Sequence, residues 1–178
     1  MARYVALLRA VNVGKCKVPM AELRAMAEDL GLEVPKTLLQ SGNLVFGSSK
    51  SESALETLLE KEAEKRFGFP IDFMVRSREH WEAIIDANPY PKQAKDDAAH
   101  LVVLALKKAP SSDALKTLRA AIKGPETVEL NGREAYLHYP DDIGHSKLTN
   151  TVLEKKLGVP GTGRNWNTVL KLMEMLEA

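Results

Sequence analysis

The chain of 178 residues has only one cysteine, Cys16, which excludes an intrachain disulfide. A lone thiol is typical of a reducing compartment, so we expect a cytoplasmic protein. No apolar run approaches the ~18 residues of a membrane span, and no basic segment leads into a long apolar stretch at the start. We therefore expect neither a membrane helix nor a secretory leader. The histidines lack metal-ligand spacing, and we expect no metal and no cofactor.

Charge of one sign is not in excess, because 25 basic residues stand against 24 acidic ones and give a net charge of +1. No global field therefore attracts nucleic acid or an anionic membrane. Aromatic residues make up 6% of the chain, and the expected strands at 4–8 and 43–46 are mostly aliphatic. RNA-recognition sheets instead carry aromatic side chains for base stacking. Nucleic acid is thus a less expected partner than a small molecule, no membrane partner is expected, and the oligomeric state stays open.

Apolar residues are plentiful at 44%, enough for the core of one ordinary domain or of two small ones. In the first half, helical spacing followed by glycine predicts helices, and short β-type runs around residues 40–42 predict a hairpin. A capping box at 53–56 opens the second helix, and Gly68 ends it. We expect strands at 4–8, 34–39, 43–46 and 71–75, and helices at 19–30 and 53–67.

The second half repeats this order after a short helix that Ser77 caps and a polar, proline-containing linker at 88–99. Expected strands lie at 101–106, 127–130, 134–139 and near 160–164, and expected helices at 112–122, 148–157 and 169–176. Both halves therefore have the order β-α-β-β-α-β. We predict an α+β fold of two tandem ferredoxin-like (split βαββαβ) units with additional helices. The first covers 1–87 with its connecting helix, and the second covers 100–178 with its C-terminal helix.

The strand directions of such a sheet predict which loops meet. The first and second strands run the same way, so the loop with Arg9, Asn12 and Gly14 shares one end of the sheet with Ser41 and Asn43. In the second unit, the loop 141–147 and the stretch 164–168 share an end by the same logic. If these ends face each other, the segments line one cleft between the units, a packing that the sequence does not fix.

Polar and cationic side chains at these loop ends form the candidate site. Three cations would neutralise an anionic small molecule, and the amide and hydroxyl groups would orient it. The candidate ligand-binding residues are Arg9, Asn12, Gly14, Ser41, Asn43, Lys147, Arg164, Asn165 and Asn167. The first loop has neither Walker nor G-x-G-x-x-G spacing, which disfavours nucleotide binding of those types. Catalytic residues are not assigned, and enzymatic activity stays open.

Each candidate also has a purely structural interpretation. Asn12 can hydrogen-bond backbone of its own loop, and Asn165 or Asn167 can cap a helix beside a packed Trp166. His145 next to two aspartates is the only acid/base cluster, or else part of a solvated loop. The asparagines could also join the two units through buried hydrogen bonds.

Five motifs carry a resemblance to a known family: LRAVNVG (8–14), VPMAELR (18–24), LQSGN (39–43), SKL (146–148) and RNWNTV (164–169). In these motifs the chain resembles domain-of-unknown-function family 1697, a group of bacterial proteins, over essentially its whole length. The resemblance implies an α+β fold of two ferredoxin-like units and implies no activity. The segment 15–17 (KCK) departs from the Gly- and Asn-rich loop of that family, so we do not treat Cys16 as a nucleophile.

The sequence thus leads to two functional hypotheses. The first is a protein that binds an anionic small molecule in a cleft between the units, with a reaction not defined. The second is a nucleic-acid or protein interaction module that uses the same polar surface, for which nucleic-acid binding would weaken steeply with salt.

Overall fold

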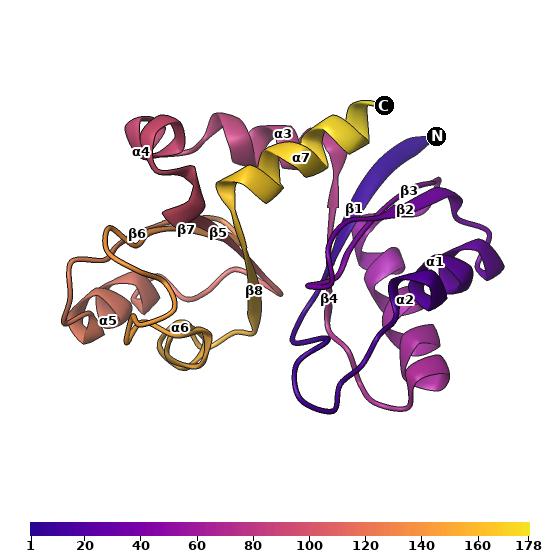
Figure 1. The fold of residues 1–178 in the computed structure, drawn as a ribbon, viewed down its shortest axis with the longest axis horizontal. Helices are drawn as coiled ribbons and strands as arrows, with labels where there is room; N and C mark the ends of the chain where they lie inside the picture. The colour runs from indigo at the N-terminus through magenta and orange to yellow at the C-terminus, as the bar shows by residue number, and fades with distance from the viewer. The chain divides into compact units, whose positions relative to one another are not determined.

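The computed structural model describes residues 1–178, which divide into two compact units. One unit comprises Met1–Ala83 and Leu172–Ala178, and the other comprises Ile84–Lys171. The protein is mixed α and β, with two four-stranded antiparallel sheets and seven α-helices (Figure 1). None of these helices combines the length and the apolar character that crossing a bilayer requires.

The first unit contains one sheet with the strand order β2-β3-β1-β4. Its elements are β1 (Ala2–Leu8), α1 (Met20–Asp29), β2 (Glu33–Thr37), β3 (Asn43–Ser48), α2 (Glu52–Phe67) and β4 (Phe73–Ser77). Both β1 and β2 pair antiparallel with β3, so they run in the same direction. Helices α1 and α2 pack on one face of this sheet (Figure 1), where Leu23 and Leu59 join Ala6 and Phe46 in the core.

Helix α2 begins earlier than the sequence predicted. Its N-cap is Ser51, whose hydroxyl accepts a hydrogen bond from the Ala54 N–H at 3.1 Å, so the capping box expected at 53–56 is wrong. A hydroxyl caps best when it meets the backbone N–H three residues on, and Ser51 meets that condition with its backbone still extended. The helix ends as predicted at Gly68, which has a φ of 83°.

Three glutamates of α2 accept hydrogen bonds from the backbone N–H groups at the outer edge of β4. They lie four residues apart, so their side chains follow one face of the helix. Each accepts a backbone N–H of the edge strand through Oε2: Glu52 from Ser77 at 2.7 Å, Glu56 from Val75 at 2.9 Å, and Glu60 from Phe73 at 2.9 Å. This glutamate ladder replaces the neighbouring strand that β4 lacks on that side.

The second unit has the strand order β6-β7-β5-β8. The remaining elements are α3 (Arg78–Asp86), α4 (Pro91–Asp96), the 3-10 helix η1 (Ala98–His100), β5 (Leu101–Leu106), α5 (Ala114–Ala121), β6 (Thr127–Asn131), β7 (Glu134–His138), α6 (Asn150–Leu157), β8 (Gly161–Asn165) and α7 (Trp166–Glu177). The unit boundaries fall inside α3 and α7. Helices α5 and α6 cover one face of the sheet (Figure 1), and their Leu118 and Leu153 share a core with Leu104 and Leu137.

Residues 88–99, which the sequence suggested as a linker, contain α4 and the start of η1. This segment is tied to β7 through Asp97. Its Oδ1 lies 2.9 Å from Nδ1 of His100 and its Oδ2 lies 2.8 Å from Nε2 of His138. The hydrogen bond with His138, supported by the one with His100, lowers the pKa of Asp97 below its ordinary value. The end of this segment is therefore anchored to β7 by a polar contact that links residues far apart in sequence.

Candidate functional site

Asn12 holds together the two loops at one end of the first sheet. Its Nδ2 donates to the carbonyl of Val18 at 3.0 Å and to that of Gln40 at 2.6 Å. Its Oδ1 accepts from the Val18 N–H at 2.9 Å. The loop after β1 therefore does meet the β2–β3 hairpin, as the strand directions predicted. These hydrogen bonds all join the Asn12 side chain to backbone groups, which agrees with the purely structural interpretation of this residue.

Asn43 and Ser41 close the same hairpin. Asn43 is fully buried, and its Nδ2 donates to the Leu38 carbonyl at 2.7 Å and to the Ser41 hydroxyl at 3.3 Å. Arg9 directly follows β1 and forms an ion pair with Asp72, with 3.7 Å between Nη1 and Oδ2. Gly14 supplies a φ of 56° in the loop after β1. The predicted site residues of this unit thus lie at one end of its sheet, and most of their polar groups contact the chain itself.

The predicted site residues at the β8–α7 junction have distinct environments. Arg164 is 6% exposed, and its Nη1 donates to the Thr162 hydroxyl at 2.7 Å and to the Gly163 carbonyl at 2.8 Å. Burial lowers the pKa of Arg164 to about 10. Asn165 caps α7, since its Oδ1 accepts from the Thr168 N–H at 3.0 Å, whereas Asn167 is exposed.

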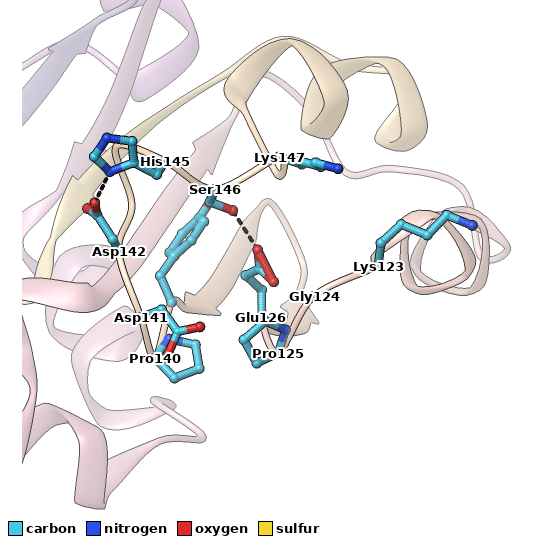
Figure 2. A pocket seen from close by; sticks show the side chains of 11 residues that line it. Lys123, Gly124, Pro125, Glu126, Pro140, Asp141, Asp142, His145, Ser146 and Lys147 are labelled. Atoms are coloured by element: carbon cyan, nitrogen blue, oxygen red, sulfur yellow. Dashed lines mark hydrogen bonds and ion pairs between the residues drawn. The ribbon is translucent and has the colours of Figure 1, made fainter.

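Lys147 lines a pocket of about 370 Å³ that lies within the second unit. Figure 2 shows how this pocket is formed by the loop before β6 and the loop after β7. The lining residues are Lys123, Gly124, Pro125, Glu126, Tyr139, Pro140, Asp141, Asp142, His145, Ser146 and Lys147. No other predicted ligand-binding residue contributes to it.

A hydrogen bond between Ser146 and Glu126 joins the two loops at the centre of this pocket. The Ser146 hydroxyl donates to Oε1 of Glu126 at 2.6 Å and accepts from the Leu148 N–H at 3.0 Å. Tyr139 lies beside this pair and donates its hydroxyl to the Leu148 carbonyl at 3.0 Å. Burial first, and the charge of Glu126 second, raise the pKa of Tyr139 to about 12, so its phenol is neutral at pH 7.

His145 and Asp142 form an ion pair on the loop after β7, between Nδ1 and Oδ2. The Gly144 N–H donates to the other carboxylate oxygen of Asp142 at 3.0 Å. The hydrogen bond and charge of Asp142 raise the pKa of His145, and the hydrogen bond from His145 lowers the pKa of Asp142. In the view of Figure 2, Lys123 and Lys147 lie on one side of Glu126, and the His145–Asp142 pair lies on the other. The pocket therefore carries groups of both charges.

No sequence pattern predicted Glu126, Lys123 or Tyr139 as site residues, because the pocket depends on a strand register. Thr127 at the start of β6 pairs with His138 at the end of β7, which brings the preceding and the following loop together. In the sequence, only the polar cluster around His145 pointed to this pocket, and it identifies just the loop after β7 and not the loop before β6. No group of three or more His, Cys, Asp or Glu side chains is placed to hold a metal ion.

The protein is therefore of the α+β class. It has two units, each with a four-stranded antiparallel sheet, and a pocket of small-molecule size in the second unit. The family model described as "Protein of unknown function (DUF1697)" matches residues 1–136, and the chain belongs to this family. This confirms the resemblance to the family, and three of the five motifs (8–14, 18–24 and 39–43) lie within the matched range. The matched range ends before the loop that carries His145, Ser146 and Lys147.

The whole chain is similar to a solved structure, that of the conserved bacterial protein SP0830 from Streptococcus pneumoniae. The two are 27% identical with a TM-score of 0.80, and the match covers 100% of this chain and 99% of that one. The similarity therefore extends over both units. Comparison with curated proteins finds no match.

Proposed function

We propose that this protein binds a small anionic molecule in the pocket of the second unit. The observation that carries the proposal is the presence of two lysines, Lys123 and Lys147, in the lining of one pocket of about 370 Å³. Both side chains are exposed, so their ammonium groups can turn toward a ligand. This volume lies in the lower part of the range of ~300–1,000 Å³ that small-molecule sites occupy, which favours a metabolite over a polymer.

The other pocket groups support an anionic ligand of limited size. The Ser146 hydroxyl is fixed in the pocket lining by the Leu148 N–H, and protonated His145 adds a third cation to the lining. The Tyr139 ring, Pro125 and Pro140 supply apolar surface for the uncharged part of a ligand. An anion bound to exposed lysines gains only about 1 kcal/mol for each pair 4 Å apart in bulk water, so we expect modest affinity.

Lys147 is the residue that this proposal shares with the site expected from the sequence. A larger cleft between the units, with Arg9 and Arg164 as further cations, stays a prediction. We also infer that each unit is ferredoxin-like and that the halves are related by duplication. The element order β-α-β-β-α-β and the strand orders β2-β3-β1-β4 and β6-β7-β5-β8 support this inference. The single free thiol of Cys16 supports a cytoplasmic location.

Thermal-shift screening against phosphorylated metabolites, nucleotides, carboxylates and short oligonucleotides tests the proposal. A ligand present at ~100 times its Kd adds about 2.7 kcal/mol to the free energy of unfolding, which shifts Tm by several degrees. We expect one class of small anion to stabilise the wild type and to lose most of that effect with Lys147→Gln. Lys95→Gln is the matched control, because Lys95 is exposed on α4 and does not line the pocket.

Two results would overturn the proposal. One is a stabilising small anion whose effect is the same with Lys147→Gln as with Lys95→Gln. The other is stabilisation by oligonucleotides alone with a steep dependence on salt, which would instead favour the interaction-module hypothesis.

A further inference from the structure

The Glu126 carboxylate has hydrogen-bonding capacity that the chain does not use. Its Oε1 accepts the Ser146 hydroxyl at 2.6 Å. Its Oε2 has less than 1 Å² of exposed surface and no hydrogen-bond partner, so no donor of the chain reaches it, those of the pocket lysines included. An ionised carboxylate offers about four acceptor positions, and buried polar atoms of native proteins are nearly always paired. Glu126 is therefore an acceptor that lacks its donor.

The Glu126 carboxylate packs against the local backbone on one side. Gly124 lies directly against it, and a Cβ atom on Gly124 would collide with Oε2 of Glu126. The carboxylate thus occupies the space that a side chain at position 124 would need. On its other side, the hydroxyl of Ser146 is itself fixed by the Leu148 N–H at 3.0 Å. The hydrogen bond from Ser146 to Oε1 therefore keeps one oxygen of this carboxylate oriented in the lining of the pocket.

The charges of the pocket point to a ligand with charges of both signs. Lys123 and Lys147 attract an anion, but Glu126 and the exposed Asp141 line the same pocket and repel one. Asp142 is already paired with His145. A purely anionic ligand would leave Glu126 unpaired and would add repulsion to it. A ligand that also carries an ammonium group satisfies the carboxylate and the lysines together.

We propose that the ligand is zwitterionic, with a primary ammonium group bound by Glu126 and a phosphate or carboxylate bound by Lys123 and Lys147, an inference that rests on the proposed function. A rotation about the side-chain bonds of Glu126 turns its carboxylate toward the ammonium while Ser146 keeps one oxygen oriented. The pocket volume of about 370 Å³ accommodates a small ligand whose two charges are joined by a short chain. Glu126 is then the residue that selects among small anions.

Isothermal titration of the full-length protein with matched probes tests this inference. O-phosphoethanolamine is compared with ethyl phosphate, and 4-aminobutyrate is compared with butyrate, so each pair differs in the ammonium group. The two pairs also distinguish a phosphate from a carboxylate as the anion. We expect the wild type to prefer the ammonium-bearing member of at least one pair about tenfold or more, the range that a charge-assisted hydrogen bond supplies.

Glu126→Gln should bring the two members of that pair to within about threefold, because the amide keeps the shape and loses the charge. Asp96→Asn is the matched control, since Asp96 is exposed on α4 and outside the pocket, and it should keep the preference. Equal affinity of the wild type for both members of each pair would overturn the inference. If Lys147→Gln then still weakened binding of both members, anion binding would stand and selection by Glu126 would fall.

Absence of binding by all four probes would also overturn the zwitterion inference, whereas the anion screen with Lys147→Gln decides the proposed function separately. Since the preference is measured first on the wild type, the test holds even if the Glu126 variant folds poorly.

Discussion

The hydroxyl of Ser146 lies 2.6 Å from Oε1 of Glu126, and this hydrogen bond connects residues twenty positions apart in the chain. It joins the loop that leads into β6 to the loop that leaves β7. The same oxygen of Ser146 accepts the Leu148 N–H, so one hydroxyl fixes both the carboxylate and the approach to α6. The hydrogen-bonded link between the two loops therefore depends on a single side chain.

Replacing this side chain tests that dependence. Ser146→Ala removes a donor from Glu126 and an acceptor from the Leu148 N–H, so we expect the free energy of unfolding to fall by about 1–3 kcal/mol. Urea denaturation monitored by circular dichroism measures it. Ser112→Ala is the control, because Ser112 is exposed, and it should change stability by less than about 0.5 kcal/mol. Equal effects of the two variants would show that the Ser146 bond is not formed in solution.

Asp97 predicts a pH-dependent contribution to stability. Hydrogen bonds with His138 and then His100 lower its pKa in the folded state. A lowered carboxyl pKa stabilises the protein above the unfolded pKa of about 3.9, and this contribution disappears as pH falls through the lower folded value. Asp97→Asn should therefore be less stable than the wild type at pH 7 and approach it in strong acid. Denaturation of both proteins between about pH 7 and pH 2.5 measures the difference in the free energy of unfolding, and a difference that stays constant with pH would contradict the role of these hydrogen bonds.

His145 predicts a pH-dependent affinity for anions. Its pKa is raised by the hydrogen bond and charge of Asp142, so its positive charge persists above the ordinary value of about 6.5 and is lost as pH rises through the raised value. Asp142→Asn should lower the His145 pKa toward the ordinary value, which proton NMR titration of the imidazole resonances measures. Anion affinity of the wild type should weaken over the same pH range. An unchanged His145 titration in the variant would show that the pair is absent in solution.

Gly42 in the β2–β3 hairpin has a structural requirement that can be measured against a matched glycine. Its φ is 91°, and a Cβ there would lie 2.8 Å from Cβ of Leu8 and 2.9 Å from Cγ2 of Val11. Gly68 has a similar φ of 83°, but no atom lies within 4 Å of its Cβ position. We expect Gly68→Ala to lower stability by about 1 kcal/mol through backbone strain alone, and Gly42→Ala to lower it by roughly 2–4 kcal/mol. Similar losses for the two variants would contradict the packing of Gly42 against β1.

Much of the fold could be predicted because its signals are local. Gly68 ends α2 as predicted, and Gly158 ends α6 directly after the expected helix 148–157, since a left-handed C-cap is decided by neighbouring residues. The cap of α2 shows the limit, because Ser51 and Ser53 are both plausible caps by composition. The backbone conformation selects Ser51.

The candidate site was harder to predict because its contacts are not local. Asn12 was recognised as a loop residue, but its bond to the Gln40 carbonyl spans 28 positions. Glu126 carried no motif at all, and its importance comes from the Thr127–His138 pairing and from Ser146. Lys147 was found because it follows a cluster of polar residues within one loop. Residue types near each other in sequence thus identified one wall of the pocket, and only the strand register supplied the other.

The glutamate ladder of α2 has a consequence for self-association. An edge strand with unpaired N–H groups is a template onto which a strand from another chain can add, and such addition leads to aggregation. On β4 the donors of Phe73, Val75 and Ser77 are already occupied by carboxylates, which would also repel an incoming backbone carbonyl. One helix therefore both covers the core and closes the sheet against growth at this edge.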